Sequence, residues 1–198
     1  MRRRFARRVR SQPRELRRQP RFDVVIGPRT LSVARAVLVG LPGAGKSTVA
    51  RALGHFWDCG VVDTDDEVAQ RAGVDVAELL RTHGEIALRT LELDVLNSLK
   101  DRDVVVATGG GVVTTTEARA LLREEVTVWL DCDDATLVSR LGEGDRPLLG
   151  DDWTTSLARL RVERSTWYEE VARERVDASG SVVDVVARVV ASIGAHES

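Results

Sequence analysis

A glycine-rich turn between an apolar strand and a helix constrains the fold of this chain more than any other feature. The segment GLPGAGKST, residues 40–48, matches the pattern G-x-x-x-x-G-K-[ST] in full and follows the apolar run AVLV. Glycines let backbone N–H groups turn inward around an anion, and the next helix adds the positive end of its dipole. The segment therefore predicts a buried strand, a phosphate-binding loop and a helix over residues 46–53.

Lys46 stands out because the chain has only two lysines, Lys46 and Lys100, among 29 basic residues. An ammonium group is a compact charge on a thin stem, so it can reach between β- and γ-phosphates where a guanidinium fork would not fit. The Ser47 hydroxyl is placed for Mg²⁺. The predicted ATP-binding residues of this loop are Gly43, Ala44, Gly45, Lys46, Ser47 and Thr48.

Apolar runs and helical patterns alternate along the rest of the chain. Strands are predicted at residues 34–40, 59–64, 103–111, 126–132 and 175–179. Helices are predicted at 46–53, 66–80 with a break at Gly73, 84–100, 116–124, 134–141, 154–171 and 182–193. This alternation predicts an α/β fold of three layers, in which helices cover both faces of a five-stranded parallel sheet, and the phosphate-binding loop makes it a P-loop fold. A helical substrate-binding insertion at about 63–92 and a lid loop at about 142–153 complete the prediction.

Composition and charge bound the domain organisation. The length of 198 residues suits one domain, and an apolar content of 43% with 30% charged residues indicates a soluble protein. The first 21 residues carry ten arginines and one acid, so we expect residues 1–34 to be a disordered basic extension of a P-loop domain at 35–198. Binding of nucleic acid by this arm is a weaker alternative. We expect a cytoplasmic monomer without membrane attachment, in which Cys59 and Cys132 are core or near-core residues.

Two aspartates are predicted at the carboxyl end of the second strand, where sites form in open parallel sheets. Asp63 and Asp65 lie two residues apart, and on an extended segment their side chains would face opposite ways. One would then serve a metal ion while the other accepts hydrogen bonds from a substrate hydroxyl. The alternative is a solvated cluster of acids at the start of a helix, which suits Asp66 best.

Glycines and arginines supply the remaining candidates. Gly109, Gly110 and Gly111 leave no side chain at the end of the third strand, so a ligand can lie against backbone N–H groups; a plain tight turn is the alternative. Arg146 lies in the glycine-flanked loop GDRPLL, which can close over a triphosphate. Arg89, Arg146 and Arg164 can converge on the phosphoryl group and an acidic substrate, although each alone is more typical of a surface charge.

Taken together, these stretches resemble the shikimate kinases, small members of the nucleoside-monophosphate-kinase-like P-loop family. The order is GLPGAGKST, DTD, a GE…R…E run (residues 84, 85, 89 and 92), GGG, RPLL, and an arginine before a tyrosine (residues 164 and 168), over about residues 36–195. The resemblance implies that Lys46 and the loop hold ATP and that Ser47 with Asp63 organises Mg²⁺. It further implies roles in shikimate binding for Asp65, Arg89, Arg164, Gly109, Gly110 and Gly111. Asp65 would accept the proton of the attacking 3-hydroxyl, Arg146 would meet the phosphoryl group, and Arg140 would stack on adenine.

The chain also departs from the family pattern. Thr166 stands where the family has a proline, and Leu80 and Leu88 stand where aromatic residues commonly line the shikimate pocket. These departures keep two alternatives open: a related gluconate- or nucleotide-kinase-like enzyme, and a nucleotide-binding regulatory protein that uses the basic arm.

Overall fold

The computed structural model of the chain describes residues 35–99, 102–141 and 152–195. The predicted extension at 1–34 and residues 142–151 of the predicted lid lie outside the described residues. Among the helices of the described ranges, none is long and apolar enough to cross a membrane.

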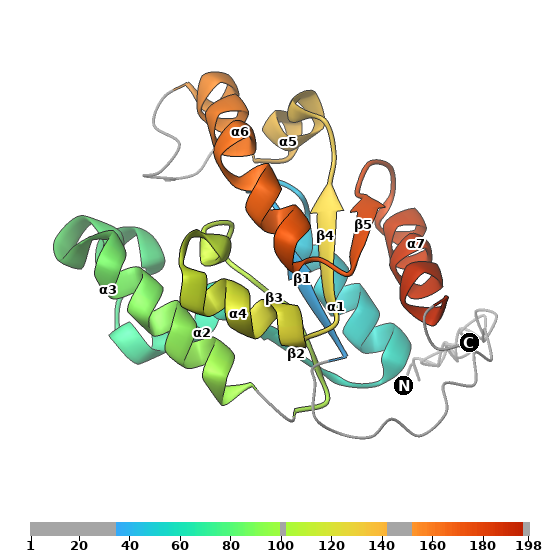
Figure 1. Cartoon of the computed structure of the whole chain (residues 1–198), viewed down its shortest axis with the longest axis horizontal. Helices are drawn as coiled ribbons and strands as arrows, with labels where there is room; N and C mark the ends of the chain where they lie inside the picture. The colour runs from blue at the N-terminus through green and yellow to red at the C-terminus, as the bar shows by residue number, and fades with distance from the viewer. Residues whose placement is uncertain (1–34, 100–101, 142–151, 196–198) are drawn as a thin grey trace, which may run out of the picture. The chain divides into compact units, whose positions relative to one another are not determined.

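A five-stranded, fully parallel sheet forms the centre of the fold (Figure 1). Its order is β2 (Gly60–Asp63), β3 (Val104–Ala107), β1 (Ala36–Val39), β4 (Thr127–Asp131) and β5 (Glu174–Asp177). Leu38 of β1 pairs with Ala107 of β3 and with Val128 of β4. The phosphate-binding loop and the triglycine segment therefore leave the sheet at the same edge, since the carboxyl ends of parallel strands meet there.

Two groups of helices cover this sheet. In one group, α1 (Lys46–Trp57) packs with α7 (Val182–Gly194). In the other, α4 (Thr116–Glu124) packs between α3 (Val76–Ser98) and α6 (Trp153–Val171), while α2 (Thr64–Ala72) lies against α3 and α5 (Asp134–Leu141) against α6. A 3₁₀ turn, η1 (Val112–Thr114), follows the triglycine segment. The α/β prediction is confirmed, and helices 116–124 and 134–141 match their predicted bounds.

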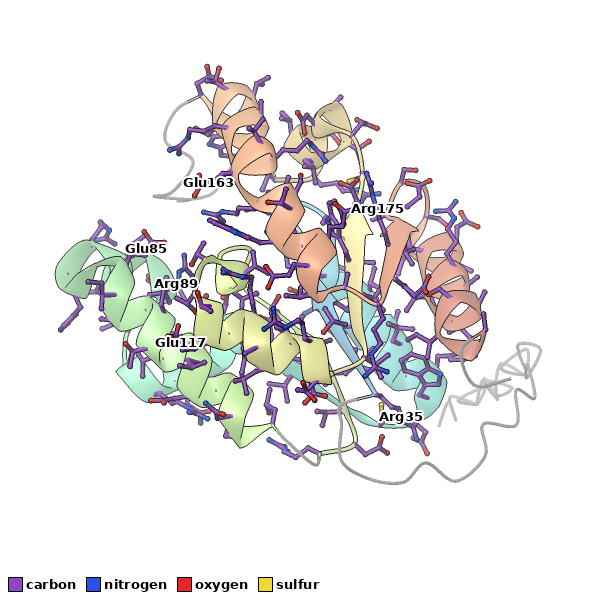
Figure 2. The ribbon with its side chains drawn as sticks, viewed as in Figure 1. Arg35, Glu85, Arg89, Glu117, Glu163 and Arg175 are labelled. Carbon is purple, nitrogen blue, oxygen red and sulfur yellow. The ribbon has the colours of Figure 1, made fainter. Side chains whose placement is uncertain are left out.

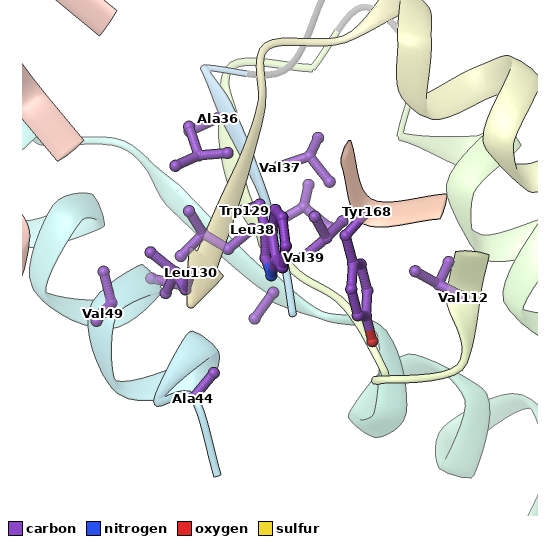
Figure 3. Close-up of a cluster of buried hydrophobic side chains, with 14 of the residues drawn as sticks. Ala36, Val37, Leu38, Val39, Ala44, Val49, Val112, Trp129, Leu130 and Tyr168 are labelled. Atoms are coloured by element: carbon purple, nitrogen blue, oxygen red, sulfur yellow. The ribbon is translucent and has the colours of Figure 1, made fainter. Parts of the chain in front are cut away.

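The core follows from the strand sequences. All four residues of β1 and of β3 are buried, as expected for central parallel strands of apolar residues. Figure 3 shows Leu38 and Val39 of β1 beside Trp129 of β4, whose ring stacks on Tyr168 of α6 with centroids 5.7 Å apart. Cys132 is buried and Cys59 half-buried, both as free thiols.

Several boundaries differ from the predictions. The second strand ends at Asp63 and α2 begins at Thr64, so the expectation that Asp65 lies on an extended segment is wrong. The predicted helix 84–100 is the second half of α3, which begins at Val76 and kinks at Gly84, where φ is 79°. The break at Gly73 is confirmed, because α2 ends there with a left-handed residue. The sequence patterns predict neither η1 nor the extension of α1 beyond residue 53 to Trp57.

Candidate active site

The phosphate-binding loop is shaped by its glycines and by its fit against neighbouring elements. Gly43 has a φ of +85°, and a Cβ atom there would lie 2.6 Å from the Leu137 carbonyl oxygen of α5. Only glycine suits both the left-handed backbone and this close approach. Gly45, also left-handed, is the N-cap of α1, so the loop leads directly into the positive end of that helix.

Lys46 is held within this loop. Its side chain is 8% exposed, and Nζ donates hydrogen bonds to the carbonyl oxygens of Gly40 at 2.9 Å and Leu41 at 3.0 Å. A buried ammonium needs such partners, because desolvation of an uncompensated charge is costly. The loop thus holds one positive charge beside the amides at the start of α1.

A cavity of about 740 Å³ lies over this edge of the sheet. The predicted site residues that line it are Gly43, Ala44, Gly45, Lys46, Ser47, Thr48, Asp65, Arg89, Gly109, Gly110, Gly111 and Arg140. Leu80 and Leu88, where the family has aromatic residues, also line it. Asp63 and Arg164 are not among its lining residues, and Arg146 lies outside the described part of the chain.

The D-T-D segment joins β2 to α2. Asp63 caps α2, because its Oδ1 accepts a hydrogen bond from the Asp65 backbone N–H at 3.1 Å. Buried Thr64 accepts a hydrogen bond from the Gly109 N–H at 2.9 Å, which ties this segment to the triglycine. Asp65 lines the cavity, but protein atoms surround most of its carboxylate. The resulting loss of hydration raises the pKa of Asp65. The Asp63 carboxylate raises that pKa further, whereas Lys46 opposes the rise.

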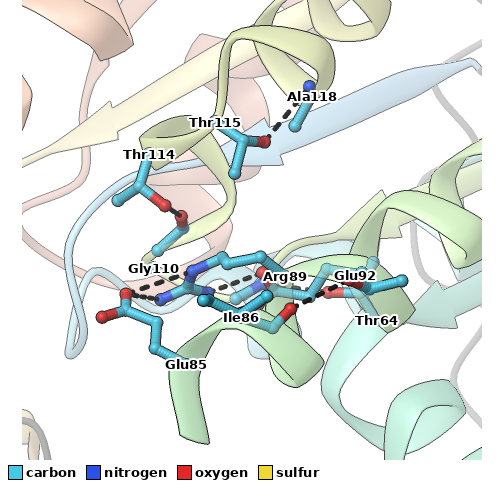
Figure 4. A network of polar contacts seen from close by, with 12 residues as sticks. Thr64, Glu85, Ile86, Arg89, Glu92, Gly110, Thr114, Thr115 and Ala118 are labelled. Atoms are coloured by element: carbon cyan, nitrogen blue, oxygen red, sulfur yellow. Dashed lines mark hydrogen bonds and ion pairs between the residues drawn. The ribbon is translucent and has the colours of Figure 1, made fainter.

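Arg89 is the centre of an ion-pair cluster on α3, in which Arg89 and Glu92 are buried and Glu85 is exposed (Figures 2 and 4). Its Nη1 donates to Glu92 Oε2 at 2.6 Å, and its Nη2 donates to Glu85 Oε1 at 2.8 Å. Burial works against the charge of Arg89, but the ion pairs with Glu92 and Glu85 outweigh it, so its pKa is raised. Burial raises the pKa of Glu92, and the Arg89 guanidinium works against that rise.

The triglycine segment makes room for this cluster. A Cβ atom at Gly109 would lie 2.7 Å from both Asp65 Oδ1 and Glu92 Oε1, and one at Gly111 would lie 2.1 Å from Arg89 Nη2. At Gly110 it would lie 2.9 Å from Pro42 of the phosphate-binding loop. The absence of side chains here therefore lets charged groups of the protein, as well as any ligand, approach the backbone.

Arg164 reaches the same segment from α6. The side chain is buried, and Nη1 donates to the Gly110 carbonyl oxygen at 2.9 Å. Within the described residues, its buried Nε has no hydrogen-bond partner. A buried guanidinium donor without a partner is costly in a folded protein, which suits a group that a ligand completes.

Arg140 marks the opposite end of the cavity. Its two terminal nitrogens donate to the carbonyl oxygens of Ala178 at 2.9 Å and Gly180 at 3.1 Å. These carbonyls belong to the turn between β5 and α7, which also lines the cavity with Ser181 and Val182. The guanidinium is thus fixed beside this turn, and its contact with a nucleotide stays a prediction.

Sequence reasoning missed three contributors to the site. Glu92 enters the sequence prediction only as part of the GE…R…E run, although its i,i+3 spacing from Arg89 on a helix predicts an ion pair. The role of Thr64 as the acceptor for the Gly109 N–H had no signal in the sequence. The turn of residues 178–182, which lines the cavity, is not among the residues predicted from the sequence.

Comparisons with known proteins agree with this geometry. The family model described as "Shikimate kinase" matches residues 42–194. Shikimate kinase of Mycobacterium tuberculosis is 42% identical over 146 residues, which cover 72% of this chain and 83% of that protein. The chain belongs to the shikimate kinase family. This membership makes it an ATP-dependent kinase with a hydroxyl group as the acceptor.

Solved structures separate this family from the alternatives. A shikimate kinase from Acinetobacter baumannii in complex with shikimate has a TM-score of 0.79 and 31% identity, and the match covers 85% of this chain and 96% of that one. A gluconokinase from Sinorhizobium meliloti has a TM-score of 0.52 and 18% identity over 81% of this chain and 91% of that one. The second likeness shows the fold alone, so the comparisons favour the shikimate kinase prediction over the gluconate-kinase alternative.

Proposed function

We propose that this chain transfers the γ-phosphoryl group of ATP to the 3-hydroxyl of shikimate, giving shikimate 3-phosphate and ADP. The observation that carries the proposal is the meeting of Arg89 and Arg164 at the triglycine segment. Arg89 lies against Gly111, and Arg164 donates to the Gly110 oxygen. One buried guanidinium that lines the cavity, a second that is bonded to Gly110 in the cavity wall, and a phosphate-binding loop in the same cavity suit an acceptor that carries a carboxylate.

The phosphate side of the reaction falls to the loop and α1. Gly43, Ala44 and Gly45 line the cavity with their backbone, and Lys46 is the nearby cation. We assign the β- and γ-phosphates to these amides and to Lys46, whose Nζ would exchange carbonyl partners for phosphate oxygens. Thr48 lines the same wall, and Arg140 is assigned to the adenine ring.

The donor set fits Mg²⁺. Ser47 and Asp63 offer hard oxygen atoms, and Asp63 uses only one carboxylate oxygen to cap α2. Among the described residues, no group of three or more His, Cys, Asp or Glu side chains could hold a metal ion. Mg²⁺ in kinases typically uses one or two protein ligands and completes its shell with waters and substrate phosphates. The bound ion would neutralise charge on the transferring phosphoryl group.

The acceptor side aligns a hydroxyl with the γ-phosphate. Arg89 and Arg164 hold the shikimate carboxylate, and Asp65 accepts a hydrogen bond from the attacking hydroxyl. The new bond joins the shikimate oxygen O3 to the γ-phosphorus, the bond from that phosphorus to the bridging β,γ-oxygen breaks, and the hydroxyl proton passes to Asp65. The gain in rate comes from positioning and charge neutralisation, since phosphoryl transfer needs little covalent chemistry from the protein.

Leu80 and Leu88 supply the apolar wall of the acceptor pocket. A leucine side chain can pack against an apolar ring face by dispersion, but it lacks the flat face of an aromatic ring. Arg146 remains a prediction from the resemblance, which assigns it to the phosphoryl group.

All the assigned groups come from a single chain, so a monomer suffices for activity.

A coupled assay of ADP release tests the proposal. MgATP is supplied with shikimate, gluconate, a panel of nucleoside monophosphates, or no acceptor. Turnover that depends on shikimate alone is the expected result. Turnover with gluconate or a nucleotide in its place, from folded and ATP-binding protein, would overturn the proposed acceptor.

A further inference from the structure

One backbone carbonyl in the site accepts hydrogen bonds from two side chains of α6. Arg164 Nη1 donates to the Gly110 oxygen at 2.9 Å, and the Tyr168 hydroxyl donates to the same oxygen at 2.5 Å. The two donors lie four residues apart, so they share one face of the helix. A carbonyl oxygen has two lone pairs, and these two donors occupy both.

The Tyr168 hydroxyl is fixed by the core rather than by the cavity. Tyr168 is fully buried, and its ring stacks on Trp129 at an interplanar angle of 28° (Figure 3). The Arg175 guanidinium, labelled in Figure 2, lies 4.5 Å from the Trp129 ring centroid. Burial raises the pKa of Tyr168, so its hydroxyl keeps its proton and remains a donor.

The Arg164 guanidinium depends on that carbonyl. Its Nη1 donates to that oxygen, and its buried Nε has no hydrogen-bond partner among the described residues. If the Gly110 carbonyl turns, the guanidinium turns with it. A fork of two donors binds a carboxylate well only within a narrow range of orientation.

We infer that Tyr168 is a positioning residue for acceptor binding, because its hydroxyl fixes the Gly110 carbonyl and thereby orients Arg164. The inference rests on the proposed function, in which Arg164 binds the acceptor carboxylate. Gly110 lines the cavity, whereas Tyr168 and Arg164 lie behind that wall residue, so Tyr168 acts on the acceptor through its neighbours Gly110 and Arg164.

The variant Tyr168→Phe tests the inference, since it keeps the stacked ring and removes only the donor. The loss of one neutral hydrogen bond predicts a rise of about three- to tenfold in the KM for shikimate. The KM for ATP and kcat stay within about twofold of the parent values, because no phosphate-binding group is moved. Ser165→Ala is the matched control, because its hydroxyl bonds only to the Arg161 carbonyl oxygen within the helix.

Two further measurements separate positioning from stability. Replacement of Tyr168 by 4-aminophenylalanine, which restores an N–H donor at the same point of the ring, returns the KM for shikimate toward the parent value. In an Arg164→Lys background, Tyr168→Phe adds less than about twofold, since the group that it orients is already lost. All variants are assayed at a temperature where circular dichroism shows them folded.

The outcomes distinguish the inference from the proposed function. A raised KM for shikimate in Arg164→Lys, together with an unchanged KM in Tyr168→Phe, overturns the inference and leaves the proposed function standing. An unchanged KM for shikimate in Arg164→Lys overturns both. Equal rises in both KM values, or an effect on kcat or thermal stability alone, also overturn the inference, because a merely structural tyrosine would give that result.

Discussion

Gly111→Ala is a single-methyl change that displaces an arginine without touching the arginine itself. Gly111 has a φ of −99°, so its backbone accepts alanine without strain. The new Cβ would lie 2.1 Å from Arg89 Nη2 and 2.5 Å from Arg89 Cζ. An ordinary contact needs about 3.4 Å or more, so the guanidinium must move by more than an ångström away from the triglycine.

This displacement of the guanidinium lowers the stability of the fold and weakens the binding of the acceptor. The guanidinium is the far end of the flexible Arg89 side chain, so it could move. It is held in place, however, by the carboxylates of Glu92, 2.6 Å from Nη1, and Glu85, 2.8 Å from Nη2. Stretching these bonds lowers the free energy of unfolding by about 1–3 kcal/mol. The loss of one charge-assisted bond to the acceptor, about 1.5–3 kcal/mol, raises the KM for shikimate by about 10- to 150-fold.

Steady-state kinetics with both substrates, together with urea unfolding, measure the two effects. Arg89→Ala sets the upper limit for the rise in the KM for shikimate. Gly194→Ala is the control glycine, because among the described residues no atom beyond its chain neighbours and its own helix backbone lies within 4 Å of its would-be Cβ at the end of α7. An unchanged KM for shikimate in folded Gly111→Ala would refute the placement of Arg89 at the acceptor.

Two further predictions follow from the buried groups. Lys46→Met removes the ammonium beside the loop carbonyls, so we expect a loss of at least about a thousandfold in kcat/KM with the circular dichroism spectrum retained; substantial activity in the folded variant would refute its role. Tyr168 is the only tyrosine of the chain, and burial raises its pKa above the ordinary 10.0, so its contribution to stability is present below pH 10 and is lost as the pH rises from there toward the folded-state pKa. Urea unfolding above pH 10 should show a steeper fall for the parent protein than for Tyr168→Phe, and equal slopes would contradict the raised pKa.

The sequence predicts the phosphate side of the site well because local rules govern it. The loop of residues 40–48 carries its glycines, lysine and helix start within one short segment, and the structure places that segment as the pattern requires. Helices 116–124 and 134–141 also follow from local periodicity and capping, as the Thr115 cap of α4 illustrates.

The acceptor side was less predictable because distant contacts decide it. Asp65 lies on a helix rather than a strand, since the Asp63 side chain caps α2 immediately after β2. The sequence predicts the glycines at 109–111 as ligand contacts, because they leave space beside the backbone. In the structure, the atoms nearest to that space belong to Asp65, Glu92, Arg89 and Pro42. No pattern within one segment reports that Arg89 lies against Gly111, because the two residues come from different elements.

The position of the phosphate on the product decides whether the chain phosphorylates the 3-hydroxyl of shikimate. Shikimate is incubated with MgATP and the protein, and the product is examined by proton–phosphorus correlation spectroscopy. We expect one new phosphomonoester, coupled to the proton on carbon 3, since Arg89 and Arg164 fix the carboxylate and Asp65 selects one hydroxyl. A phosphate on another hydroxyl, or no shikimate phosphate from folded protein that hydrolyses or binds ATP, would contradict this prediction.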